Sequence, residues 1–385
     1  MPLSRSRARV VALLALAALV AVAAFAPAAQ AGSSKQVRVM TRNLYLGADL
    51  TPAIQATSLF GLAQAGSQIW STVQATNFPE RAKVLAKEIA AADPDLIGLQ
   101  EAAIWRTGAP DGPPILGGSP ATTVTYDYLQ SLLDELAAVG SPYVLVRKQQ
   151  EADLEGPTLN GFDIRLTQQD AILAKKSRVD AGVLSWTATG SANYPAALNL
   201  KLPLLGGSAN GGVDIESTRG YVFADIVSKQ AGSFRFVDTH LEAFSAGFRA
   251  AQAQFLATAG PASTTSQPVV LVGDLNSAPG DTSTSGVDPT PNGLAFNVLT
   301  GVFGYQDTWA QANPGDPGFT SGFNEFVNDP DTSGIDHRID HVLTRGAAVG
   351  SDYAKVTGLD PANRTPGGLW PSDHAGVSTK VYPNP

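Results

Sequence analysis

The sequence has no cysteine among its 385 residues, which excludes a disulfide framework, thiolate catalysis and zinc–thiolate sites. Charged residues make up only 16% of the chain, and acidic residues outnumber basic ones to give a formal net charge of −8. A broad basic surface for nucleic acid is therefore not supported, although a local cleft could still be positive. Internal repeats and long linkers are also absent, so we expect residues 32–385 to form a single domain.

The sequence has one long apolar run, and it lies at the N-terminus. Arg5, Arg7 and Arg9 precede the Ala/Leu/Val-rich run Val10–Phe25, and Ala29-Gln30-Ala31 follows it. This pattern predicts a secretory signal peptide over residues 1–31, whose removal lowers the net charge by three to −11. A membrane anchor is the alternative, but the run is short for a span. We therefore expect a secreted, soluble protein without stable membrane insertion.

The pattern of strands and helices is typical of an α/β protein. Apolar and polar residues alternate over Val37–Asn43, which predicts a strand. Asn77–Ala92 carries the apolar stripe of a helix, and Asp95–Glu101 is predicted to be a buried strand. We expect an irregular segment over Glu155–Gln169 and a loop or hairpin tip over Pro195–Asp214. The other expected elements are helices at 126–139, 248–259 and 292–299 and strands at 143–147, 170–174, 221–227, 233–239, 339–343 and 376–381.

The segment Val269–Asn276 is the clearest candidate for a site. Four apolar residues run into Gly-Asp-Leu-Asn, which predicts a strand buried on both faces with polar residues at its carboxyl end. Ligands of layered α/β proteins bind at such strand ends. Asp274 and Asn276 are two residues apart and point the same way on an extended chain. A strand-ending turn is the alternative, because Gly, Asp and Asn are common turn formers.

The segment Leu50–Thr76 is rich in Ala, Gln, Ser and Thr, and predicts one or two helices or an ordered loop. It could be a surface insertion. It could also be a flap on the substrate side, with Phe60 and Trp70 exposed.

Acids, amides and imidazoles recur at the expected strand ends, which is hard to explain by turn chemistry alone. A hard divalent cation prefers oxygen ligands and would neutralise phosphate charge. A carboxylate beside an imidazole can activate water, and amides can hold charge on phosphoryl oxygens. The set suits phosphate-ester hydrolysis, and no serine elbow, P-loop or dinucleotide fingerprint competes with it. Its members are Asn43, Glu101, His240, Asp274, Asn276, Asp340, Asp373 and His374.

Five motifs carry a resemblance to a known family: Gln100-Glu101, Thr239-His240-Leu241, Gly273-Asp274-Leu275-Asn276, Arg338-Ile339-Asp340-His341 and Ser372-Asp373-His374. In this order they resemble the motifs of the endonuclease/exonuclease/phosphatase superfamily. The resemblance extends from about Val37 to Val381. It implies an α/β fold, the four-layered sandwich in which two face-to-face mixed β-sheets are flanked by helices, and by default a monomer.

The resemblance also implies roles for the cation and the attacking water. Glu101 would be the main Mg²⁺ ligand, with Mn²⁺ or Ca²⁺ as alternatives, and Asn43 would hydrogen-bond in the same metal cluster. Asp373 would lie near the metal or the water. Asp274 would align or deprotonate the attacking water.

The phosphate would be bound by the remaining residues. Asn276 and His240 would hydrogen-bond the phosphoryl oxygens, and His374 would face the phosphate with Asp340 orienting its ring. The reaction would be an in-line attack on phosphorus without a covalent enzyme intermediate.

The sequence departs from the apurinic-site nucleases of the family. Tyr45 stands where they carry an acid, and they lack a histidine at the position of His240. The chain looks more like the secreted deoxyribonucleases, sphingomyelinases and inositol-phosphate phosphatases. His337 and His341 are expected to be structural or surface residues.

The expected function is a secreted metal-dependent phosphodiesterase whose substrate is a nucleic acid or a phospholipid. The alternatives are a phosphomonoesterase of the inositol-phosphate type and a non-catalytic binding protein on the same scaffold.

Overall fold

Two mixed β-sheets lie at the centre of the protein in the computed structural model, which describes residues 35–202, 213–284, 287–346 and 348–385. The expected signal peptide, residues 1–31, lies outside the described residues. Lys35–Pro385 forms one compact unit. No helix of the described chain is long and apolar enough to cross a membrane.

The first sheet has eight strands. Seven of them follow the order β15 (Val349–Thr357), β16 (Gly376–Tyr382), β1 (Val37–Asn43), β2 (Leu96–Gln100), β6 (Asp163–Lys175), β3 (Ile104–Gly108) and β4 (Thr123–Asp127), and β5 (Tyr143–Pro157) pairs along β6. The second sheet has the order β13 (Gln306–Asp307), β14 (Asp340–Arg345), β12 (Val269–Asp274), β11 (Gly232–His240), β10 (Gly220–Ser228) and β7 (Leu184–Asn193). A separate hairpin pairs β8 (Leu198–Leu202) with β9 (Val213–Ser217).

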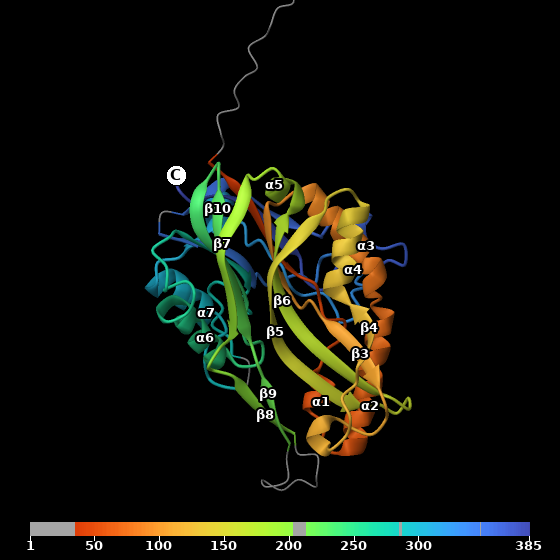
Figure 1. Ribbon diagram of the computed structural model, residues 1–385. Coiled ribbons are helices and arrows are strands. Elements are labelled where there is room, and N and C mark those ends of the chain that lie inside the picture. Colours follow the sequence, from red (N-terminus) through yellow and green to blue (C-terminus); the bar gives the residue numbers. More distant parts are fainter. Residues whose placement is uncertain (1–34, 203–212, 285–286, 347) are drawn as a thin grey trace, which may run out of the picture. The chain divides into compact units, whose positions relative to one another are not determined.

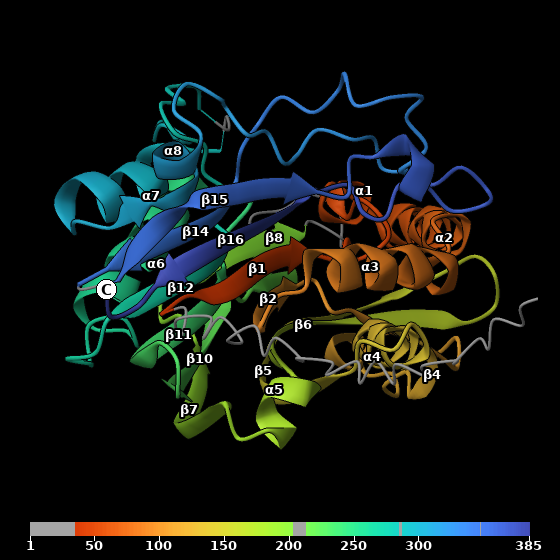
Figure 2. The ribbon, with the colours of Figure 1, turned by 90° about the horizontal axis from the view of Figure 1, so that it is seen from above.

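Helices cover the outer faces of both sheets, so the protein has the four layers that the sequence predicts (Figures 1 and 2). The first sheet packs against α2 (Leu59–Ala75), α3 (Phe78–Ala92) and α4 (Tyr128–Ala138), and the second against α6 (Ala246–Thr258) and α7 (Leu294–Asn297). The remaining α-helices are α1 (Thr51–Ile54), α5 (Lys176–Asp180) and α8 (Thr308–Ala312). Short 3₁₀ or π turns lie at Pro114–Leu116, Val298–Val302 and Pro361–Asn363.

Apolar side chains from both sheets fill the layer between them, among them Leu96, Phe234 and Val272. Strand β12 is buried at every residue, as the apolar run predicts, because the first sheet covers one face and α6 the other. Gly98 of β2 marks the closest approach of the sheets. A Cβ atom there would lie 2.4 Å from Cγ2 of Val272, so a larger residue would force the layers apart.

Most of the expected elements occur, but the prediction of an irregular segment over Glu155–Gln169 is wrong. Strands β5 and β6 form a long antiparallel ribbon through it. Cross-strand charges help to hold the ribbon, since Arg165 donates from Nε to Asp153 Oδ1 at 2.8 Å between the buried Ile164 and Leu166. The two strands of the hairpin expected within 195–214 are β8 and β9, and the tip of the hairpin lies outside the described residues.

The segment Leu50–Thr76 is an integral part of the fold and not a loose insertion. It forms α1 and α2, and Ser58 caps α2 by accepting a hydrogen bond from the Gly61 backbone. The expected exposure of Trp70 is wrong, because its ring packs among Trp105, Tyr126 and Phe162 with centroids about 6 Å apart. Phe60 is exposed as expected.

Candidate active site

The carboxyl ends of four strands bring the predicted polar residues to one place. Parallel β1 and β2 end side by side, with Asn43 paired to Gln100 in register. Parallel β11 and β12 end with His240 opposite Asp274, and antiparallel β14 begins with Asp340 opposite Asp274. Asn43 Nδ2 donates to Asp274 Oδ2 at 3.0 Å, so one hydrogen bond joins the two sheets within the site.

The backbone is strained where these strands end. Tyr45, Glu101 and Asn276 have φ values of 60°, 57° and 49°, in the left-handed region that few non-glycine residues adopt. Side-chain hydrogen bonds hold these turns. The Tyr45 amide donates to Asn43 Oδ1 at 2.8 Å, and the Asn276 amide donates to Asp274 Oδ1 at 2.8 Å. Such strain is typical of functional sites.

His374 and Asp340 form a close hydrogen bond in the catalytic cluster, 2.8 Å from Nδ1 to Oδ2. Burial lowers the pKa of His374, but the charges of Asp340, then Asp373 and Asp274, outweigh it and raise the pKa well above the usual value. Nδ1 donates to Asp340, and the raised pKa favours the imidazolium form of the ring. Its Nε2–H is left to interact with an anionic substrate.

Asp274 lies between the two histidines. Its Oδ2 is 3.5 Å from His240 Nε2 and 3.9 Å from His374 Nδ1. Burial, and then the charge of Asp340, raise the pKa of Asp274 to about 6. A buried carboxylate with this pKa can take a proton from water near neutral pH, which is what a general base requires.

His240 is held as a neutral imidazole. Burial, and then the charge of Arg219, lower its pKa well below the usual value. Arg219 Nη1 lies 3.0 Å from His240 Nδ1 and 3.3 Å from Nε2, so a guanidinium that can only donate faces the ring and disfavours a second positive charge on it. Asn276 Nδ2 lies 3.1 Å from Nε2 and donates to the Leu241 carbonyl at 3.0 Å. His240 and Asn276 therefore place N–H groups at one side of Asp274.

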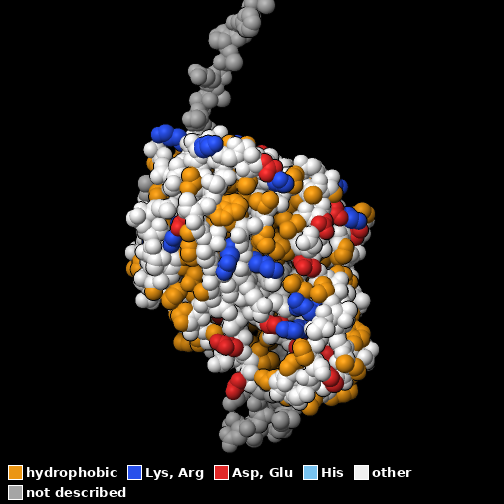
Figure 3. Space-filling model, viewed as in Figure 1, with side chains coloured by type: hydrophobic (Ala, Val, Ile, Leu, Met, Phe, Trp, Pro, Cys, Tyr) orange, Lys and Arg blue, Asp and Glu red, His pale blue; other side chains and the backbone are white. Residues whose placement is uncertain are grey.

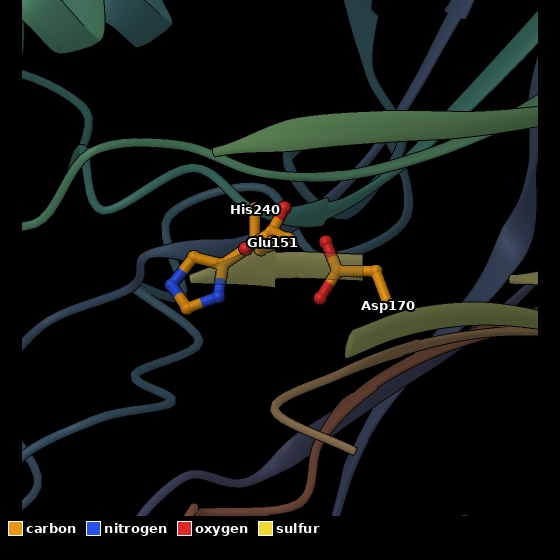
Figure 4. A group of neighbouring side chains, drawn as sticks. All are labelled: Glu151, Asp170 and His240. Carbon is orange, nitrogen blue, oxygen red and sulfur yellow. The ribbon is translucent and has the colours of Figure 1, made fainter. Parts of the chain in front are cut away.

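Sequence reasoning missed a buried polar cluster behind His240. Figure 4 shows Glu151, Asp170 and His240 coming together, and their nearest ligand atoms lie within 4.8 Å of one another. Glu151 Oε1 accepts from the Gly220 amide at 2.7 Å, and Oε2 lies 3.6 Å from Arg219. Burial raises the pKa of Glu151 to about 7 and that of Asp170 well above its usual value. The Arg219 guanidinium already supplies the cation here.

Asp274, Asp340 and His374 form the other group of the described residues with metal-ligand spacing. The hydrogen bond from His374 Nδ1 to Asp340 orients the imidazole within this group. His337 is exposed and His341 is buried, with Nε2 at 2.9 Å from the Ser277 carbonyl, so neither lies in the cluster.

Glu101 and Asp373 are the best candidates to hold a divalent cation. Glu101 Oε2 accepts from the Leu46 amide at 2.7 Å, which orients the carboxylate. Burial, and then the charge of Asp373, raise the pKa of Glu101 to about 7, and burial also raises the pKa of Asp373. Two half-buried like charges facing one cavity are relieved by a hard cation. Asn43 Oδ1 already accepts from Tyr45, so a role for Asn43 as a metal ligand stays a prediction.

Arg81 of α3 holds the loops that carry these ligands. It is fully buried, and it donates to the carbonyls of Thr76, Leu44, Pro371 and Tyr45 at 2.8–3.1 Å. One guanidinium therefore joins two loops. The first leads to Leu46, whose amide binds Glu101, and the second leads to Asp373.

Arg81→Met is expected to lower the free energy of unfolding by about 3 kcal/mol or more, because it leaves several buried carbonyls without a donor. Urea denaturation would measure the change. Arg147→Met, at an exposed arginine, is the matched control and should change stability by about 0.5 kcal/mol or less. Equal effects of the two substitutions would show that the Arg81 hydrogen bonds do not hold the loops.

The sequence profile of the Endonuclease/Exonuclease/phosphatase family matches residues 69–374, most of the chain and nearly all of this site. The chain belongs to this family. It is therefore a hydrolase of phosphate esters, and the described site contains acidic and histidine groups that could bind a metal. No curated protein matches the sequence.

Solved structures show the same fold. The endonuclease/exonuclease/phosphatase from Beutenbergia cavernae is 20% identical, with a TM-score of 0.52 over 90% of this chain and 71% of that one. A humanized D. rerio TDP2 is 15% identical, with a TM-score of 0.50 over 90% of this chain and 99% of that one. An endonuclease/exonuclease/phosphatase family protein from Bacteroides thetaiotaomicron is also 15% identical, with a TM-score of 0.50, over 90% and 97%.

Proposed function

We propose that the chain is a secreted, monomeric, Mg²⁺-dependent phosphodiesterase. The observation that carries the proposal is the arrangement around Asp274. A neutral His240 and Asn276 lie on one side of this carboxylate, and the imidazolium of His374 lies on the other. The site thus offers a base, a cationic hydrogen-bond donor and neutral hydrogen-bond donors to one phosphorus centre.

In the proposed mechanism Asp274 accepts the proton of the attacking water. His240 and Asn276 Nδ2 donate to the phosphoryl oxygens, and His374, oriented by Asp340, places its positive charge where negative charge develops in the transition state. Glu101 and Asp373 would hold the cation, which supplies further charge neutralisation when bound. The proposed reaction is a direct in-line attack of water on phosphorus, without a covalent enzyme intermediate.

The proposal predicts metal-dependent cleavage of phosphodiesters. Purified protein beginning at Gly32 should hydrolyse bis(4-nitrophenyl) phosphate with Mg²⁺ and lose at least about 100-fold of its activity in EDTA. Supercoiled plasmid in a parallel assay would separate a nuclease from an enzyme of small diesters. Folded protein that cleaves the monoester 4-nitrophenyl phosphate but neither diester would indicate a phosphomonoesterase instead. Folded protein that cleaves none of the three substrates would indicate a binding protein. Finding the mature form outside the producing cell, with Gly32 as its first residue, would test secretion.

A further inference from the structure

A cavity of about 490 Å³ adjoins the catalytic cluster at the proposed cation ligands and carries information on the substrate. Glu101, Asp373, Gln168 and Arg219 line one part of it. The same cavity therefore contains the proposed cation ligands and the residues that contact His240.

The rest of the cavity wall is mainly aliphatic. It is built by α1 and α2, by the β5–β6 ribbon and by the β8–β9 hairpin, which lie together at the lower end of the molecule in Figure 1. Representative residues of these three walls are Ala53 and Leu62, Leu154 and Leu166, and Leu202 and Ile215. Leu62, Leu202 and Ala56 also form an apolar cluster of their own, so this wall is packed and not a chance gap.

The charges of the cavity disfavour a polyanion. Arg219 is the one basic side chain among its described lining residues, whereas Asp49, Glu155 and Glu325 add acids to those of the cation site. Figure 3 shows apolar side chains interspersed with acidic ones at the lower part of this face, where Figure 1 places β8, β9, α1 and α2. A nucleic-acid strand would need cations along its phosphates. An uncharged apolar group attached to a single phosphate needs none.

We infer that this cavity binds the alkyl or acyl chain of an amphiphilic phosphate diester, whose phosphate lies at the catalytic site. The inference rests on the proposed function and adds the substrate class to it. Its physical basis is that each methylene moved from water into an apolar wall strengthens binding by about fourfold. The chain would lie between α1–α2 and the β8–β9 hairpin, with the second ester oxygen leaving toward solvent.

A homologous series of alkyl 4-nitrophenyl phosphates tests the inference. Water adds to phosphorus, the bond to 4-nitrophenolate breaks, and the proton of the water goes to Asp274, so the products are an alkyl phosphate and a coloured anion. With Mg²⁺ present, kcat/KM should rise by about fourfold per methylene at first, and by at least about 100-fold from methyl to octyl.

The variant Ala53→Phe fills the cavity with a ring and should lower the octyl-to-methyl ratio of kcat/KM by about 10-fold or more. Ala137→Phe makes the same change at an exposed position of α4 and should leave the ratio as in the wild type. A binding measurement complements these rates. By titration calorimetry with Mg²⁺, octylphosphonate should bind at least about 100-fold more tightly than methylphosphonate.

The outcomes separate the two proposals. Tight octylphosphonate binding without hydrolysis of any diester would refute the proposed function and leave the chain-binding site standing. Hydrolysis with no dependence on chain length, and equal binding of both phosphonates, would overturn the site alone. Faster cleavage of thymidine 5′-(4-nitrophenyl phosphate) than of the octyl ester would also overturn it, because the cavity would then take a nucleoside.

Discussion

Replacing Asp274 by Asn is expected to lower kcat by about 10²- to 10⁴-fold, the usual contribution of a general base. Asparagine has nearly the same shape and can still accept the hydrogen bond from the Asn276 amide, so the fold should persist although the hydrogen bond from Asn43 is lost. It cannot take a proton from water. Steady-state kinetics with bis(4-nitrophenyl) phosphate, together with a thermal melt for folding, would measure both effects.

His374→Ala should produce a loss of similar size, because it removes the cationic donor and leaves Asp340 buried without its partner. His337→Ala is the matched control, since His337 is exposed and its ring pairs with the neighbouring Asp336, away from the catalytic cluster. Its activity should stay within about twofold of the wild type. If both histidine variants or neither lost activity, the role assigned to His374 would be refuted.

The strands that build the site could be predicted because the apolar pattern of each strand lies within a few consecutive residues. The run before Asp274 is apolar enough to be buried on both faces wherever it lies. Since parallel strands end at a common edge, residues at the ends of such runs could be expected to meet without knowing the sheet order. The structure brings Asn43, His240 and Asp340 to Asp274 in this way.

Arg219 and Gln168 could not be found in this way, because their roles depend on register between distant strands. Gly220 pairs with His240 across β10 and β11, which sets Arg219 beside the ring. Gln168 reaches the same ring, 3.4 Å from Nδ1, from a ribbon whose polar sequence reads as irregular. Period-two apolar alternation is the signal that reveals a strand and its register, and in β6 it covers only Ile164 and Leu166 before the polar run Thr167–Asp170.

The error at Trp70 has a related cause. Its surroundings in sequence are Ala, Gln and Ser, which indicate an exposed helix. The aromatic residues that bury it, Trp105, Tyr126 and Phe162, come from three later segments. Burial of a single large residue is decided by such tertiary partners, which local composition does not encode.

Glu101→Gln is expected to raise the free energy of unfolding of the metal-free protein by about 3 kcal/mol at pH 8. Burial, and then the charge of Asp373, raise the pKa of Glu101 from 4.5 to about 7. The folded state therefore binds this proton more tightly than the unfolded state does. The stability that it confers is complete below about pH 4.5 and is lost as the pH rises through about 7. Glutamine stays neutral and can still accept from the Leu46 amide, so its advantage should grow with pH.

The same substitution at Glu88 should have the opposite sign. Glu88 is also buried, but it is paired with Arg42 at 3.0 Å and accepts from Thr357 at 2.7 Å, so Glu88→Gln should lower stability by about 3–5 kcal/mol. Urea denaturation from pH 5 to 8 would measure both variants without metal. Mg²⁺ at 100 times its Kd should then stabilise the wild type by about 2.7 kcal/mol and leave Glu101→Gln nearly unchanged. If Mg²⁺ stabilised both proteins equally, Glu101 would not be a cation ligand, because a site that binds the ion has to lose affinity when its carboxylate is removed.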